Sequence, residues 1–147
     1  MEGCIAAVMD FDGVLARTST LGAVEPRGLG FEVARSLASA GLKLYVVTGR
    51  GPRDRGLVAS LLRRGGFPLA RLGGIMVNEL GVGEVEWKLE AAMEIAGREG
   101  CVAEVHDDNE YVLGSLRRLA GGGVLHWDDK CSVVYGVSRA PQCSRSP

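Results

Sequence analysis

The stretch AAVMDFDGVL, residues 6–15, decides how this chain folds. A short apolar run leads into two carboxylates one residue apart, Asp10 and Asp12, and Gly13 follows them. The apolar run is typical of a buried strand, and glycine permits a sharp turn after the acids. If the strand continues through Asp12, both carboxylates lie on one side of it. Burying charge there is costly unless a cation or hydrogen bonds compensate it, so the stretch predicts a metal site and chemistry, with an ordinary strand-to-loop junction as the alternative.

Beyond residue 15, apolar runs alternate with amphipathic stretches in strand-helix order. We expect strands at 4–9, 42–47, 74–77, 101–105, 124–127 and 132–135, and helices at 28–40, 52–64, 85–97 and 111–120. This order predicts an α/β fold, three-layer and Rossmann-like, with a mostly parallel central sheet. We expect one domain over residues 1–137 and a flexible tail at 138–147, because the tail lacks a core-forming pattern.

Composition narrows the class of protein. The chain has 147 residues, 46% of them hydrophobic, and a formal net charge of −1, which fits one globular domain. No apolar run approaches the length of a membrane span, so we expect a cytoplasmic protein without a membrane partner. The near-neutral charge gives no general attraction to nucleic acid, which is therefore expected only as a substrate. Composition leaves a homo-oligomer open.

The four cysteines form no C-x-x-C pair, which argues against a zinc site. Cys4 precedes Asp10 by six residues, and Cys101 precedes Asp107 by six. Neighbouring parallel strands would therefore place these two thiols side by side. A disulfide is geometrically feasible there, and two ordinary thiols are the alternative.

Polar motifs follow the predicted strands at the point where each strand ends. Asp10 and Asp12 follow the first strand, residues 48–50 (Thr-Gly-Arg) follow the second, and residues 106–109 (His-Asp-Asp-Asn) follow the fourth, with Lys88 near the start of the helix that leads there. In a parallel sheet with helical crossovers, ligands bind at this edge. The motifs therefore predict one shared site.

These segments, in this order, resemble the haloacid dehalogenase (HAD) superfamily of phosphotransferases, over roughly residues 4–127. The resemblance implies a phosphatase that hydrolyses phosphoric monoesters with Mg²⁺ as cofactor. Asp10 would attack phosphorus to form an aspartyl-phosphate, and Asp12 would act as general acid and base. Thr48 would donate to a phosphoryl oxygen, and Lys88 would neutralise negative charge.

The resemblance also implies ligand sets for the metal and the substrate. Mg²⁺ would be held by Asp10, Asp12 (through its backbone carbonyl), Asp107 and Asp108, and the substrate by Gly49 and Arg50. Each motif also has a plainer explanation: Thr48 could cap a turn, Lys88 could be a solvated helix residue paired with Glu84, and Asp107 with Asp108 could cap a helix.

Only 35 residues separate Asp12 from Thr48, and 39 separate Thr48 from Lys88. Neither segment leaves room for a large cap domain, so we expect an open, capless site or one closed by a neighbouring subunit. An open site suits a phosphorylated small molecule or a phosphorylated polymer end. Arg50, Arg53 and Arg55 could meet a second phosphate, which makes a polynucleotide 3′-phosphate phosphatase the alternative.

Three other classes of protein compete with a phosphatase. A receiver-like signalling domain also uses an aspartyl-phosphate, but its paired acids precede the phosphorylated aspartate on a different strand. A nucleotide-binding module would need a G-x-x-x-x-G-K-[ST] loop, which the chain lacks. A catalytically silent phosphate-binding relative stays open, although the intact acidic and basic residues argue against it.

Overall fold

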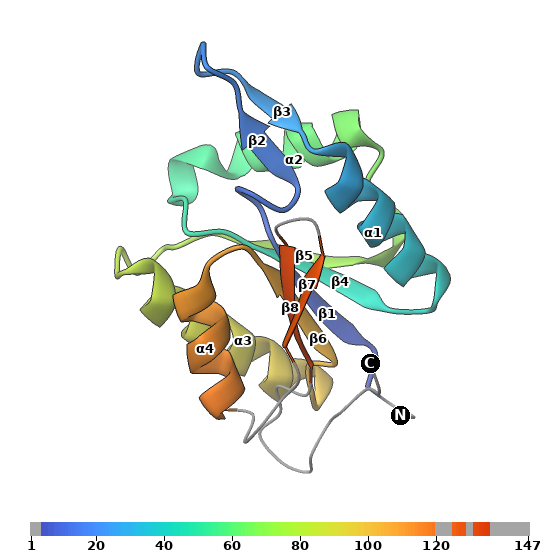
Figure 1. Cartoon of the computed structure of the whole chain (residues 1–147), viewed down its shortest axis with the longest axis vertical. Helices are drawn as coiled ribbons and strands as arrows, with labels where there is room; N and C mark the ends of the chain where they lie inside the picture. Colours follow the sequence, from blue (N-terminus) through green and yellow to red (C-terminus); the bar gives the residue numbers. More distant parts are fainter. Residues whose placement is uncertain (1–3, 120–124, 129–130, 136–147) are drawn as a thin grey trace.

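The central sheet has six strands in the order β5-β4-β1-β6-β8-β7 (Figure 1). The computed structural model describes residues 4–119, 125–128 and 131–135. The parallel strands are β1 (Ala6–Asp10), β4 (Lys43–Val47), β5 (Leu72–Met76) and β6 (Glu104–Asp107). An antiparallel pair, β8 (Cys131–Tyr135) and β7 (Leu125–Asp128), extends the sheet beyond β6. A mostly parallel sheet is thereby confirmed.

Helices cover both faces of this sheet. On one face lie α1 (Gly28–Ser39) and α2 (Arg55–Gly65), and on the other lie α3 (Glu84–Glu99) and α4 (Glu110–Leu119) (Figure 1). Short 3₁₀ turns, η1 (Pro52–Asp54) and η2 (Leu69–Arg71), precede α2 and β5. The three-layer arrangement predicted from the sequence is confirmed. No helix in the described residues combines the length and apolar character that crossing a membrane requires.

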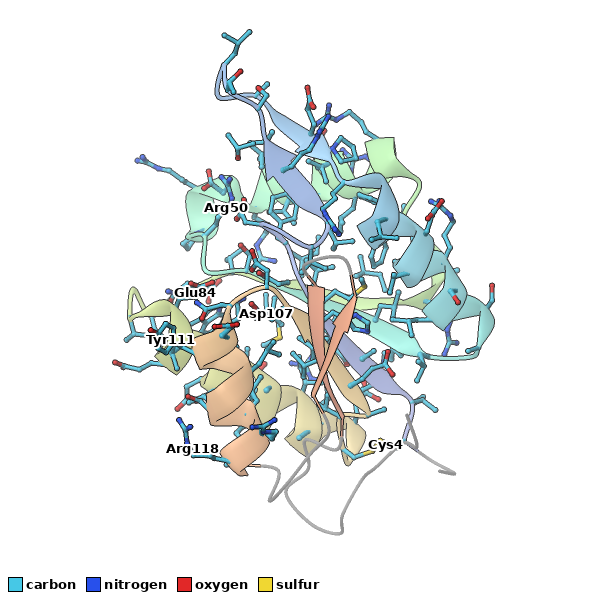
Figure 2. All side chains as sticks on the ribbon, in the orientation of Figure 1. Cys4, Arg50, Glu84, Asp107, Tyr111 and Arg118 are labelled. Atoms are coloured by element: carbon cyan, nitrogen blue, oxygen red, sulfur yellow. A yellow bond between two sulfur atoms is a disulfide. The ribbon has the colours of Figure 1, made fainter. Side chains whose placement is uncertain are left out.

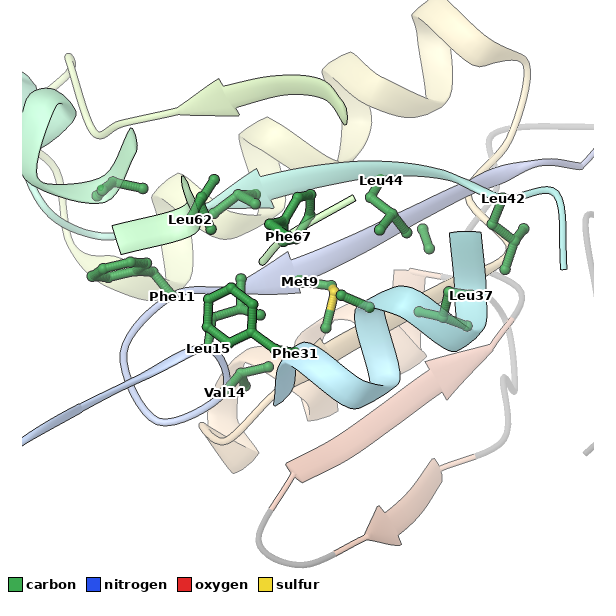
Figure 3. Close-up of a cluster of buried hydrophobic side chains, with 14 of the residues drawn as sticks. Met9, Phe11, Val14, Leu15, Phe31, Leu37, Leu42, Leu44, Leu62 and Phe67 are labelled. Atoms are coloured by element: carbon green, nitrogen blue, oxygen red, sulfur yellow. The ribbon is translucent and has the colours of Figure 1, made fainter. Parts of the chain in front are cut away.

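Both faces of β1 are buried, and this packing holds the last residue of the strand in position. Ala7 and Met9 pack in the cluster under α1 and α2, together with Phe31 and Leu62, and Figure 3 shows Met9 among these aromatic and aliphatic side chains. Val8 belongs to the second cluster, on the α3 and α4 face. Each such large side chain stabilises the fold by about 1.5–3 kcal/mol when fully buried. The residue that ends β1 therefore stands on a rigid support.

The strand β1 ends at Asp10 and does not continue through Asp12. The carbonyl of Phe11 accepts hydrogen bonds from the backbone N–H groups of Leu15 (2.9 Å) and Ala16 (2.8 Å), which closes a tight loop, and Gly13 has a φ of 86° there. Glycine adopts this left-handed conformation without strain. The two acids therefore do not share a strand face, and each has its own environment.

A hairpin that the sequence did not predict follows this loop. It consists of β2 (Ala16–Thr18) and β3 (Val24–Pro26), paired antiparallel, and it projects beyond α1 and α2 (Figure 1). Strand β6 also differs from the strand expected at residues 101–105, because it begins only at Glu104, although residues 101–103 are buried.

Cys4 and Cys101, the pair for which the sequence spacing left a disulfide open, are bonded in the structure. Strands β1 and β6 pair in parallel, and their register places Cys4 beside Cys101, with a Cα–Cα distance of 5.8 Å and a disulfide between the two sulfurs. The bond joins the segments that lead into β1 and β6, at the opposite end of the sheet from Asp10. The predicted domain tail, residues 138–147, lies outside the described residues.

Removing this disulfide should destabilise the protein. It closes a loop of 97 residues, so its loss should lower the free energy of unfolding by about 2–4 kcal/mol. We expect a reductant to lower the thermal midpoint of the wild type and to leave that of Cys4→Ala unchanged. Mass spectrometry of unreduced protein that finds both thiols free would contradict the pairing.

Candidate active site

The residues that the sequence placed at one site do converge. Asp10 is the last residue of β1, Thr48 follows β4, Asp107 is the last residue of β6, and Lys88 lies in the second turn of α3. The chain reverses its direction of winding at β1, because β4 and β5 lie on one side of it and β6 on the other. Crevices of this kind, at the carboxyl ends of strands, bind ligands. Figure 2 shows Asp107, Glu84 and Arg50 in this region, far from Cys4.

At the centre of the site, Lys88 lies between two carboxylates. Its Nζ is 2.8 Å from Asp10 Oδ1 and 2.6 Å from Asp107 Oδ2. The side chains of Lys88, Asp10 and Asp107 are 3%, 4% and 2% exposed. We call these three residues the buried triad. Glu84, one turn before Lys88, places Oε1 3.6 Å from the same Nζ.

Burial and charge shift the protonation of all three groups. Burial raises the pKa of Asp10 well above its ordinary value, and the nearby Asp107 raises it further, against the opposing effect of Lys88. Burial also raises the pKa of Asp107. Burial alone would lower the pKa of Lys88, but Asp10 and then Asp107 reverse this and raise it overall. With both carboxylates ionised, the triad carries one negative charge in excess, which a bound cation would offset.

Three carboxylates are close enough to share a metal ion. Asp10, Glu84 and Asp107 each offer an oxygen, and these oxygens lie within 4.8 Å of one another. Carboxylate oxygens are hard ligands of the kind that Mg²⁺ prefers, so the donor set and the excess charge both fit this ion. The sequence had assigned Glu84 only to an ion pair with Lys88. Glu84 lies one helical turn before Lys88 on the same face of α3, and this spacing was the sequence signal that could have placed Glu84 at the metal site.

The other two acids predicted for the metal lie differently. The carboxylate of Asp12 faces Arg50 and not Asp10. The side chain of Asp108 lies against Gly13, where the Cβ of any other residue would collide with its carboxylate. Metal ligation by the Asp12 carbonyl and by Asp108 stays a prediction.

Thr48 is fully buried and held by three hydrogen bonds. Its N–H donates to the carbonyl of Met76 (3.0 Å), its carbonyl accepts from Trp87 Nε1 (2.7 Å), and its Oγ1 accepts from the N–H of Arg50 (3.1 Å). Because the hydroxyl oxygen is the acceptor in the last bond, its proton can be donated to a ligand. This geometry suits the predicted bond to a phosphoryl oxygen.

Arg50 forms a two-pronged ion pair with Asp12. Its Nε and Nη2 each lie 2.9 Å from one Asp12 oxygen, and its Nη1 lies 3.3 Å from Asp54 Oδ2. The hydrogen bond to Asp12 raises the pKa of Arg50, although burial opposes this effect. Asp54 is a partner that the sequence analysis missed. Arg55 lies apart from this group and donates to the carbonyl of Ile75 (2.8 Å).

Asn109 joins three parts of the site. Its N–H donates to Asp107 Oδ1 (2.9 Å), and its Nδ2 donates to Glu84 Oε2 (3.0 Å). Its Oδ1 accepts from the N–H groups of Tyr111 and Val112, which caps the start of α4. The sequence had placed residue 109 in the motif without a role. It fixes the orientation of Asp107 relative to α3.

Two grooves open to solvent beside the buried triad, and they meet at Asp12. One has a volume of about 490 Å³ and is also lined by Gly13, Ala16, Arg17, Thr18, Arg27 and Asp108. The other has about 630 Å³ and is also lined by Glu84, Asp108, Asn109, Glu110 and Tyr111. Between residues 12 and 107, all of which are described, the chain forms the hairpin and the sheet with its helices and inserts no further domain.

Comparisons with known proteins bear on the fold alone, and they do so through one solved structure. No protein-family model matches the sequence, and no curated protein matches it. The structure is similar to a Vibrio cholerae protein described as a 3-deoxy-D-manno-octulosonate 8-phosphate phosphatase, with a TM-score of 0.51 and 15% identity over 80% of this chain and 63% of that one. A Streptomyces avermitilis MA-4680 protein described as a HAD family hydrolase matches at a TM-score of 0.39 and 20% identity, over 69% of this chain and 56% of that one.

This chain therefore spans less than two thirds of the length of either solved structure. The Vibrio cholerae match confirms the expected Rossmann-like fold, which this chain shares with one protein described as a phosphatase.

Proposed function

We propose that the protein is a phosphomonoester hydrolase of the HAD type, dependent on Mg²⁺ and acting through an aspartyl-phosphate on Asp10. The observation that carries the proposal is the buried triad at the carboxyl edge of β1 and β6. A nucleophile, a fixed cation and a metal-binding acid are the parts that phosphoryl transfer requires there. The shared fold with a protein described as a phosphatase supports it.

Asp10 is oriented for attack by bonds to one of its oxygens. Oδ1 accepts from the N–H of Phe11 (2.7 Å) and lies 2.8 Å from Lys88 Nζ. Within the described residues these contacts hold Oδ1, so we assign the attack to Oδ2. A bond forms between Oδ2 and phosphorus while the bond from phosphorus to the leaving oxygen breaks, and Asp12 gives that oxygen a proton.

The second step regenerates the enzyme. Asp12 takes a proton from a water molecule, the water oxygen bonds to phosphorus, and the bond from phosphorus to Oδ2 breaks to release inorganic phosphate. Thr48 donates to a phosphoryl oxygen, and Lys88 keeps a positive charge beside Asp10 throughout. Asp10, Glu84 and Asp107, with the Asp12 carbonyl and Asp108, would hold Mg²⁺, which would supply positive charge to offset the negative charge of the phosphoryl group.

The open grooves suit a phosphorylated small molecule or polymer end as substrate. The alternative of a polynucleotide 3′-phosphate rested on three neighbouring arginines. Arg55 is bonded to the backbone of β5, and Arg50 is bonded to Asp12. These contacts favour the general phosphomonoesterase over a site built for a second phosphate.

Hydrolysis of an aryl phosphate tests the proposal. We expect the purified protein to hydrolyse the substrate with Mg²⁺. When a chelator removes the metal, turnover should be lost, because the excess negative charge of the buried triad is then not offset. Arg64→Gln, which removes an exposed guanidinium on α2, serves as the control variant and should match the wild type. Turnover that persists in chelator would contradict metal dependence. A protein that neither turns over nor binds BeF₃⁻ at Asp10 would contradict the proposal.

A further inference from the structure

We propose that Arg50 is a positioning residue that holds Asp12 in place as the general acid. This inference rests on the proposed function and goes beyond it, because the resemblance assigned Arg50 to substrate binding. The observation behind it is the paired contact of Nε and Nη2 with the two oxygens of Asp12, both at 2.9 Å. Parallel bonds of this kind fix the plane of a carboxylate as well as its distance.

Asp12 needs such support because of where it lies. It follows the end of β1, in the tight loop closed by Phe11, and its side chain is 47% exposed. A half-exposed side chain on a loop otherwise exchanges between rotamers. Reaction rates depend steeply on the geometry of the reacting groups. An Asp12 side chain that exchanged between rotamers would therefore donate its proton poorly.

Arg50 is itself held on several sides. Asp54 binds its Nη1, the ring of Phe11 lies 5.7 Å from its Cζ, and its N–H donates to Thr48 Oγ1. Its side chain is only 25% exposed. The guanidinium therefore links the loop after β1 to the loop after β4, and it fixes Asp12 relative to Thr48.

The pairing also leaves room for the chemistry. A guanidinium fork uses one lone pair on each carboxylate oxygen, and each oxygen keeps another. The proton that Asp12 delivers can be carried on the edge that faces away from Arg50. Arg50 therefore supports the proton donor without touching the reacting atoms.

Leaving groups of different acidity distinguish this role from a structural one. Dinitrophenolate departs without a proton, whereas an alkoxide needs one. For Arg50→Gln we expect kcat/KM to fall by about 10–100-fold with an alkyl phosphate and to stay within about threefold with dinitrophenyl phosphate. Asp12→Asn should show the same selectivity with a larger loss. The ratio kcat/KM reports only the steps up to departure of the leaving group, so hydrolysis of the phosphoenzyme does not obscure the comparison.

Two further variants complete the experiment. Arg50→Lys places a charge there but cannot form the fork, so its selective loss should be intermediate, and it replaces Arg50→Gln if that variant folds poorly. Arg64→Gln should match the wild type on both substrates. Circular dichroism melting of each variant reports folding.

Equal losses on both substrates would overturn the inference. A raised KM with unchanged kcat would also overturn it, in favour of substrate binding by Arg50. A wild type without Asp10-dependent turnover would instead overturn the proposed function, and the inference with it. The two failures are thus distinguishable.

Discussion

Replacing Asp10 with asparagine should lower turnover of an aryl phosphate by roughly 10⁴-fold or more, the usual scale for loss of a nucleophile. An amide oxygen does not attack phosphorus at a useful rate, and Asp10 is the carboxylate that both contacts Lys88 and ends β1. Steady-state release of inorganic phosphate measures the loss. Because the introduced amide oxygen can still accept the hydrogen bond from Phe11 N–H, the loss should not come from unfolding.

The same substitution should stabilise the metal-free protein. Asp10 has a raised pKa in the folded state, so this group costs stability as the pH rises from its unfolded-state pKa through its folded-state pKa, and the full cost applies above the latter. A neutral amide at this position removes the cost. We expect the thermal midpoint near neutral pH to rise, and the gain to vanish at low pH, where Asp10 in the wild type is protonated.

Glu94→Gln is the matched control for Asp10→Asn. Glu94 forms an exposed pair with Arg98 on α3, so the same carboxylate-to-amide change there should leave turnover and the thermal midpoint nearly unchanged. Full activity in Asp10→Asn would refute covalent catalysis by this residue. A lowered midpoint in that variant at neutral pH would show that the triad is stabilised by its ionised acids.

The sequence predicted the central part of the site because burial and strand direction determine it. A parallel sheet collects the carboxyl ends of its strands at one edge, so Asp10, Thr48 and Asp107 had to meet if their apolar runs were neighbours. The same register argument placed Cys4 beside Cys101 and left a disulfide between them open, and the structure contains that disulfide.

Residues that act across loops could not be found in this way. Asp54 and Glu84 lie on helix starts where an acid is ordinary, and only the folded chain shows that one binds Arg50 and the other approaches Lys88. The β2 and β3 strands have only three residues each and little burial, so their pattern is too short to predict a hairpin. The first strand was predicted at residues 4–9, and β1 ends one residue later, at Asp10. Whether it continued through Asp12 was left open, because the bonds to the Phe11 carbonyl depend on the loop that follows.

Replacing Lys88 with methionine should have the largest effect on stability. Methionine has a similar volume, but it leaves two carboxylates buried without their cation, and removal of one partner from a buried ion pair typically costs about 3–5 kcal/mol. Both carboxyls already have raised pKa values when Lys88 is present, and its loss should raise these values further. Turnover should fall as well, since a fixed positive charge beside the nucleophile is gone.

The pH dependence of this loss gives the sharper measurement. An acid whose pKa is higher in the folded state than in the unfolded state loses stability as the pH rises through the folded value. The deficit of Lys88→Met relative to the wild type, measured by urea unfolding in chelator, should therefore be larger at about pH 8 than at about pH 5. Lys43→Met, at a partly exposed lysine paired with Glu99, should lose much less stability than Lys88→Met.

Addition of Mg²⁺ separates charge from packing in the same experiment. If the deficit comes from uncompensated carboxylates, a cation that binds them in the folded state should restore part of the stability at the higher pH. A deficit that is equal at both pH values and insensitive to Mg²⁺ would instead reflect lost packing around residue 88. The expected result would mean that Lys88 offsets the charge of Asp10 and Asp107 in the metal-free fold, and that this charge is what draws the metal to the site.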